Sequence, residues 1–131
     1  MKIAIIGAGN MGTALALHSN FEKRGFKLVG IFDNNPDVIG TDINGTKVFN
    51  ISTLESFLKN NRVDIAILTT PKNAVQEIAE RLVSCGIKGI LNFSYAELKV
   101  PKDVAVENIH ISDPMMTLSY KIKEARENNF S

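Results

Sequence analysis

Residues 2–12 read KIAIIGAGNMG and carry the strongest indication of the fold in this chain. An apolar run is followed by three glycines in the spacing Gly-x-Gly-x-x-Gly. This pattern predicts a buried parallel strand that leads through a tight glycine turn into a helix. Free N–H groups at the start of that helix, together with its dipole, favour a bound pyrophosphate.

Each glycine of the turn has its own expected role. Gly7 permits the tight turn, Gly9 lets the backbone approach the phosphates, and Gly12 lets the helix lie close to the strand. The residues between the glycines are expected to line the same phosphates: Ala8, Asn10 and Met11.

An acidic residue lies at the distance that this interpretation requires. Asp33 ends a second apolar run, residues 26–32, and follows Gly12 by 21 residues. In dinucleotide-binding folds an acid near this distance accepts hydrogen bonds from the ribose hydroxyls. Its charge would repel a 2′-phosphate, and no Arg follows it directly. The pattern therefore predicts NAD(H), rather than NADP(H), as the cofactor.

Strand and helix patterns alternate along the rest of the chain. Apolar runs at residues 64–69 and 87–93 predict further strands, and residues 10–23 are expected to form the first helix. Alternation with short connections predicts an α/β fold, a Rossmann-like doubly wound parallel sheet with right-handed crossovers. We expect the dinucleotide-binding domain over residues 1–112 and a C-terminal helix and tail over residues 113–131.

Two local motifs predict where helices begin. Ser52-Thr53-Leu54-Glu55 has the form of a capping box, in which the hydroxyl and the carboxylate each satisfy N–H groups of a helix start. Thr70 is expected to cap a later helix, with Pro71 in its first turn, where a missing N–H costs nothing.

The ends of the later strands supply the remaining site candidates. In open parallel sheets, ligands lie beyond the carboxyl ends of the strands. Thr69, Thr70 and Pro71 follow one strand and are expected to flank the nicotinamide, although helix capping alone would also explain them. Asn92 and Phe93 end the next strand and either meet the nicotinamide or simply pack.

The composition argues against several other functions. Fifteen Lys and Arg face 14 Asp and Glu, so no basic stripe predicts nucleic-acid binding by this chain alone. No apolar run approaches the roughly 20 residues of a membrane span. The single Cys85 permits no internal disulfide, and no residues have the spacing of metal ligands. We expect a cytoplasmic protein without a metal site or membrane association.

Catalytic residues are not evident in the sequence. Hydride transfer to a carbonyl requires a positioned proton donor. His18 and His110 are the two histidines, and neither has an evident partner. Related dehydrogenases place the donor in a second domain, for which this chain is too short. We therefore expect no catalytic residue and no enzymatic activity.

Longer strings of the sequence resemble one family. Residues 21–26 (FEKRGF) and 86–93 (GIKGILNF) are more specific than the glycine motif, and residues 118–120 (LSY) extend the match towards the C-terminus. In these strings the chain is similar to the nucleotide-binding domain of the bacterial redox-sensing transcriptional repressor Rex family. The resemblance implies a module that senses the NADH/NAD balance, in which NADH shifts a homodimer into a form that releases DNA.

The resemblance also implies a partner subunit. The C-terminal helix, expected from Asp113 to Glu127, swaps between subunits in that family, so we expect a homodimer through this helix. Ile111 falls near the place where the family puts a partner's side chain against the nicotinamide. Family members carry a winged-helix domain ahead of the glycine motif, whereas here Met1 lies just before it. DNA contact is therefore expected only through a DNA-binding partner or a missing winged-helix domain.

Three alternatives remain open from the sequence. One is a CoA-binding protein resembling the nucleotide domain of succinyl-CoA synthetase, in which Asp33 would have no ribose 2′-hydroxyl to hold. Another is the cofactor domain of an NAD-dependent reductase whose substrate domain is absent or on another chain. The third is an interaction role without nucleotide binding.

Overall fold

The computed structural model describes residues 1–109 and 112–130. Its strands are β1 (Lys2–Ile6), β2 (Lys27–Asp33), β3 (Asp42–Ile43), β4 (Thr46–Asn50), β5 (Ile65–Leu68), β6 (Gly89–Asn92) and β7 (Ala105–Asn108). Its α-helices are α1 (Asn10–His18), α2 (Leu54–Asn60), α3 (Val75–Ser84) and α4 (Ser112–Phe130), and short 3₁₀ helices are η1 (Phe21–Arg24) and η2 (Ile51–Thr53).

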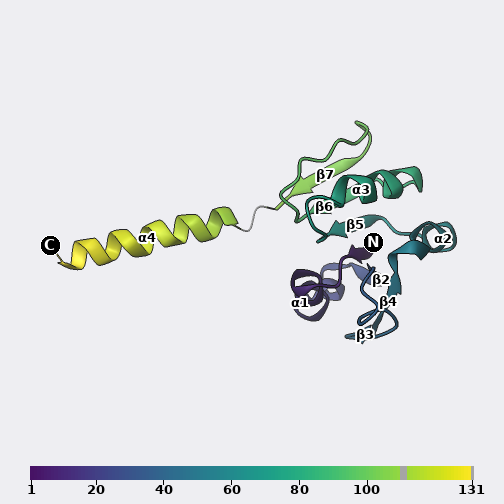
Figure 1. Ribbon diagram of the computed structural model, residues 1–131, viewed down its shortest axis with the longest axis horizontal. Coiled ribbons are helices and arrows are strands. Elements are labelled where there is room, and N and C mark those ends of the chain that lie inside the picture. The colour runs from purple at the N-terminus through teal and green to yellow at the C-terminus, as the bar shows by residue number, and fades with distance from the viewer. Residues whose placement is uncertain (110–111, 131) are drawn as a thin grey trace.

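The strands form one sheet with the order β3-β4-β2-β1-β5-β6-β7 (Figure 1). Every pairing is parallel except that of β3 with β4. The chain begins at the central strand β1, builds one half of the sheet through β2 and β4, and then continues from β5 to the other edge. The predicted doubly wound α/β fold is therefore confirmed, with the strand order reversing between β1 and β5.

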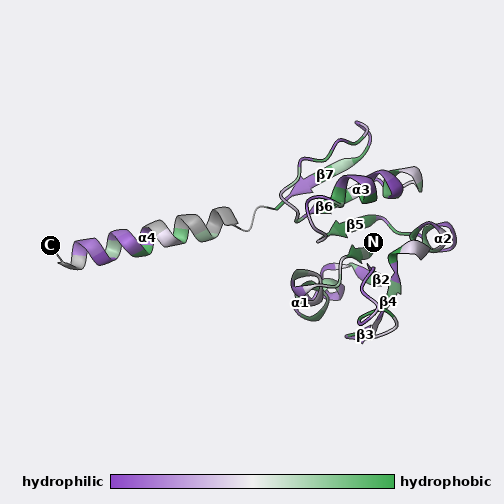
Figure 2. Cartoon of the chain, in the orientation of Figure 1, coloured by the Kyte–Doolittle hydropathy of each residue, from purple (hydrophilic) through white to green (hydrophobic). Residues whose placement is uncertain are grey.

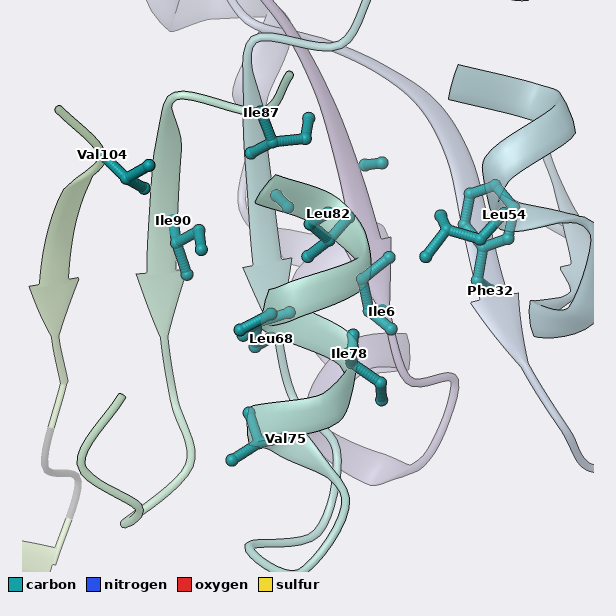
Figure 3. Close-up of a cluster of buried hydrophobic side chains, with 13 residues drawn as sticks. Ile6, Phe32, Leu54, Leu68, Val75, Ile78, Leu82, Ile87, Ile90 and Val104 are labelled. Atoms are coloured by element: carbon teal, nitrogen blue, oxygen red, sulfur yellow. The ribbon is translucent and has the colours of Figure 1, made fainter. Parts of the chain in front are cut away.

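Apolar side chains cover both faces of the sheet, and Figure 2 shows hydrophobic residues concentrated in its central strands. On one face Ile6 and Leu68 pack with Ile78 and Leu82 of α3 (Figure 3). The other face holds a second cluster of buried residues: Ile3, Ile5, Ala8, Ala16, Ile31, Val48 and Ile67. A parallel sheet needs this double cover, because its central strands are apolar on both sides.

The first helix is shorter than residues 10–23, so that prediction is wrong. α1 ends at His18, and Asn20 adopts the left-handed conformation, with φ of 56°. A left-handed residue cannot continue a right-handed helix, and asparagine tolerates this conformation better than most residues. The chain continues as η1, and this short helix is terminated by Gly25, which has a φ of 84°.

The predicted capping box is absent, although α2 begins within that motif at Leu54, and the predicted start of the later helix is wrong. The capping side chain before α2 is Asn50, whose Oδ1 accepts a hydrogen bond from the amide of Ser52 at 3.0 Å. α3 begins only at Val75, after a turn in which the amide of Ala74 donates to the carbonyl oxygen of Pro71 at 3.0 Å. The proline therefore lies in the turn before the helix.

The C-terminal helix α4 extends away from the sheet (Figure 1). Its apolar residues Met115, Leu118 and Ile122 are 66%, 58% and 45% exposed. The spacing of these residues places them along one side of the helix. In the described part of the chain, no helix is long and apolar enough to cross a lipid bilayer.

Candidate functional site

The glycine turn connects β1 to α1 at the point where the strand order reverses. Gly7 has φ of +118° and donates its amide to the carbonyl oxygen of Phe32 at 2.7 Å. A Cβ on Gly12 would lie 1.7 Å from the carbonyl oxygen of Gly7, so helix and turn touch there. Gly9 precedes α1 and has open space where a Cβ would lie. The predicted tight turn and close helix approach are both present.

The N-terminus of α1 has no capping side chain. Gly9 occupies the N-cap position, and the first turn contains no acidic residue. The first amides of a helix lack intrahelical acceptors and carry a partial positive charge. This end of α1 can therefore donate hydrogen bonds to an anion.

Thr69 joins the end of β5 to the glycine turn. Its Oγ1 lies 3.0 Å from the carbonyl oxygens of both Ile6 and Gly7, and its amide donates to Ile6 at 2.9 Å. A Cβ on Gly7 would come within 2.5 Å of this hydroxyl oxygen. The side chain of Thr69 thus connects the carboxyl end of β5 to the end of β1 and the glycine turn.

Asp33 braces the same turn from the end of β2. Its Oδ2 accepts a hydrogen bond from the amide of Ala8 at 2.6 Å, and its Oδ1 accepts one from Asn35 at 2.8 Å. A carboxylate has about four lone-pair positions, so two acceptor positions remain for other donors. The hydrogen bond from Ala8 to Asp33 cannot be predicted from the spacing of residues in the sequence alone.

These elements surround a cleft of about 760 Å³ at the carboxyl ends of β1, β2 and β5. Six residues expected at the site line it: Gly7, Gly9, Asp33, Thr69, Thr70 and Pro71. Ala8, Asn10, Met11 and Gly12 belong to the adjoining turn and helix start but do not line the cleft itself. The cleft is also lined by residues that no sequence pattern indicated: Phe32, Asn34, Ile51, Asn73, Ala74, Glu77, Ile78 and Arg81.

Thr70 carries an unpaired polar atom in this cleft. Its Oγ1 is buried and has no hydrogen-bond partner within the described part of the chain. Buried hydroxyl groups in folded proteins nearly always find a partner, either in the protein or outside it. Because this oxygen is buried, a ligand or solvent atom in the cleft would reach it only after the Thr70 side chain rotates. The hydroxyl does not form the predicted cap of α3.

Arg81 of α3 is tied to Glu55 of α2 at one end of the cleft. Its Nε donates to Glu55 Oε1 at 2.7 Å, and its Nη2 donates to Glu55 Oε2 at 3.0 Å. The same Nη2 donates to the carbonyl oxygen of Ile51 at 2.8 Å. Local patterns cannot reveal this pair, because its members are 26 residues apart in the sequence.

Asn92 is wholly buried, and its amide is fully used within the protein. The Nδ2 group donates to Ala96 and Asn108, and Oδ1 accepts from the amide and hydroxyl of Ser94. The amide of Phe93 donates to Leu68 at 2.9 Å, beside the end of β5. Neither Asn92 nor Phe93 lines the cleft, and their contact with a nicotinamide stays a prediction.

Two expected features lie elsewhere or cannot be placed. Ile111 and His110 are outside the described residues. His18 lines a second hollow of about 480 Å³, which is bounded largely by apolar side chains of the sheet such as Ile65, Ile67 and Leu91. Within residues 1–109 and 112–130, no three His, Cys, Asp or Glu side chains gather as a metal site would require.

Comparison with known proteins agrees with this geometry. Residues 1–96 match the family model described as the CoA binding domain. The redox-sensing transcriptional repressor Rex of Caldanaerobacter subterraneus subsp. tengcongensis is 52% identical over 120 residues, which are 92% of this chain and 54% of that protein. The chain therefore spans about half the length of the curated relatives that it matches.

Solved structures show the same similarity in three dimensions. The crystal structure of RSP in complex with beta-NADH has a TM-score of 0.89 and 47% identity, covering 98% of this chain and 62% of that chain. RSP in complex with beta-NAD+ and operator DNA has a TM-score of 0.86 and 47% identity, covering 98% and 59%. RSP is a Rex-family repressor, so the predicted resemblance is confirmed.

Proposed function

This chain belongs to the CoA binding domain family, and we propose that it is the NAD(H)-binding, redox-sensing module of a Rex-like transcriptional regulator. One observation carries the proposal: the glycine turn, Asp33 and Thr69 meet in one cleft where the strand order reverses. That is the place where open α/β sheets bind dinucleotides. The NADH complex of RSP, whose fold this chain shares at 47% identity, supports the same ligand.

The cleft provides a different surface for each part of a dinucleotide. The pyrophosphate would accept hydrogen bonds from the uncapped start of α1, above the open side of Gly9. The free acceptor positions of Asp33 would hold the adenosine ribose hydroxyls. The nicotinamide end would lie towards Thr70 and Pro71, beyond β5.

The alternative of CoA as ligand is less well supported. The family model takes its description from CoA, but the two similar solved structures hold NADH and NAD+. CoA carries a phosphate on its ribose, and the cleft presents the carboxylates of Asp33 and Glu77. Like charges within one cleft raise the free energy of the bound state.

Sensing requires that the two redox forms bind with different affinity. The reduced nicotinamide is uncharged and apolar, whereas the oxidised ring is cationic and more costly to bury. A ligand shifts a conformational equilibrium only through its differential affinity for the two states. We therefore expect NADH to bind more tightly than NAD+ and to favour one arrangement of a dimer.

The dimer would form through α4. We propose that residues 1–112 bind the dinucleotide and that residues 113–131 dock on a second copy. The side chains of Met115, Leu118 and Ile122 are exposed, and most of the stability of a helix in a protein comes from packing its apolar side on another surface. The hollow beside Ile65, Ile67 and Leu91 of the second copy offers an apolar surface to receive them.

The proposed role is regulatory, without catalysis by this module. The relatives are named repressors, and RSP has been crystallised with operator DNA. Since this chain spans about half of such relatives, we assign DNA contact to a winged-helix domain or a DNA-binding partner. A module of this kind would act in the cytoplasm, where bacterial DNA is transcribed.

Parallel calorimetric titrations with NADH, NAD+, NADPH and CoA test the proposal. We expect NADH to bind at least about tenfold more tightly than each of the others, which corresponds to about 1.4 kcal/mol. Tighter binding of CoA, or no binding of any of the four, would overturn the proposed function.

A further inference from the structure

The pair formed by Glu55 and Arg81 lies at the ribose end of the cleft. In the sheet, Asp33 of β2 is the register partner of Asn50 of β4, and Ile51 is the next residue. The Nη2 of Arg81 lies 2.8 Å from the carbonyl oxygen of Ile51. Neighbouring strands are about 4.8 Å apart. The guanidinium therefore lies at the same end of the cleft as the carboxylate expected to hold the ribose.

Arg81 is the single cation among the described residues that line the cleft, where Asp33 and Glu77 are the anions. A free guanidinium there would attract a ribose phosphate, because its planar N–H groups pair with phosphate oxygens in a bidentate manner. Glu55 already occupies these donors, because its two carboxylate oxygens accept hydrogen bonds from Nε and Nη2 of Arg81. The third bond, to Ile51, fixes the direction of the group.

Stability alone gives little reason for this pair. The side chains of Arg81 and Glu55 are 28% and 49% exposed. Partly exposed ion pairs contribute little to the stability of a protein, although bidentate geometry such as this one increases their contribution. Their position matters more for a charged ligand, because removal of Glu55 would expose a cation beside the ribose.

We propose that Glu55 is a specificity-determining residue that excludes dinucleotides with a phosphorylated adenosine ribose by holding Arg81. The inference rests on the proposed NAD(H) function and extends it to a residue of α2. Asp33 repels a 2′-phosphate directly, and Glu55 pairs with Arg81, the cation that lines the described part of the cleft. Neutralising Glu55 therefore turns Arg81 into a phosphate-binding group.

The experiment compares the dissociation constants of NADH and NADPH for Glu55→Gln and for the unchanged protein. We expect the ratio of the NADPH constant to the NADH constant to fall about tenfold in the variant. Glu80→Gln is the matched control, because Glu80 is exposed on α3 and does not line the cleft. The double variant Glu55→Gln/Arg81→Met should lose the gain, and reduced nicotinamide mononucleotide, which lacks adenosine, should bind equally to all variants.

The outcomes separate this inference from the proposed function. An unchanged ratio in Glu55→Gln, with NADH binding intact, overturns the role of Glu55 and leaves the NAD(H) proposal in place. A gain that persists in the double variant also overturns it, because the gain would not depend on Arg81. Failure of the unchanged protein to bind NADH overturns the proposed function instead. Circular dichroism checks folding, and Glu55→Ala replaces the glutamine variant if that variant is unfolded.

Discussion

Gly12→Ala tests whether contact between the glycine turn and α1 controls dinucleotide binding. The new Cβ would lie 1.7 Å from the carbonyl oxygen of Gly7, whereas ordinary contact begins at 3.4 Å. The obstacle is backbone, so α1 must move by about 1.7 Å to relieve it. Overpacking of this kind costs about 1–3 kcal/mol of the free energy of unfolding. For a domain of this size, we expect the melting temperature to fall by about 4–12 °C.

The same displacement moves the amides that we expect to hold the pyrophosphate. A hydrogen bond to a charged group contributes about 1.5–3 kcal/mol, so loss of one such bond weakens NADH binding roughly 10- to 150-fold. Thermal unfolding measures the first effect, and calorimetric titration with NADH measures the second.

Gly9→Ala is the matched control for this experiment. Gly9 has a negative φ of −76° and no heavy atom within 4 Å of the Cβ position. We expect this variant to melt close to the unchanged protein but to bind NADH more weakly, because the methyl group enters the space assigned to the phosphates. A Gly12→Ala variant that melts and binds NADH like the unchanged protein would contradict a controlling contact between α1 and the glycine turn.

The cleft, the stability of the fold at acid pH and the helix α4 can each be tested by one substitution. Thr70→Val removes the unpartnered hydroxyl; calorimetry should show NADH binding about five- to tenfold weaker, and thermal unfolding should show an undiminished melting temperature. The backbone amide of Lys2, and after it the side chain of Arg62, lower the pKa of Asp64 from its ordinary value of 3.8. The carboxylate therefore stabilises the fold at pH values above 3.8, and this contribution is lost as the pH falls below that value. Asp64→Asn should therefore flatten the acid limb of a stability–pH curve, and an unchanged limb would contradict the assignment. Leu118→Glu places a charge on the exposed apolar side of α4 and should shift sedimentation from dimer to monomer, whereas an intact dimer would argue against docking through this helix.

Prediction from the sequence succeeded where a local pattern determines structure. Strand β1, the glycine turn and the start of α1 follow from the run of apolar residues and the spacing of the glycines. Prediction failed where residues outside a local pattern offered its side chains or amides other hydrogen-bond partners. The capping box at residues 52–55 is absent, because Asn50 caps the helix start and Glu55 pairs instead with Arg81.

The site divides in the same way. The glycines, Asp33 and the end of β5 could be placed at the cleft from the sequence, because their positions follow from strand order and from the rule that clefts for ligands lie at the carboxyl ends of parallel strands. Arg81 was not recognisable, because a helical arginine is ordinarily a solvated surface residue. The bracing of Ala8 by Asp33 likewise joins residues 25 apart in the sequence.

Local patterns in the sequence are sufficient to predict the α/β class, the strand that begins the sheet, the glycine turn, and the acid that follows it. These features depend on periodicity, on glycine conformation and on spacing, which are properties of short stretches of chain. The pairing of Glu55 with Arg81 beside the cleft, and the lack of a partner for the Thr70 hydroxyl among the described residues, depend instead on the tertiary structure. Such contacts join distant segments, and their partners are selected by packing and by the geometry of hydrogen bonds.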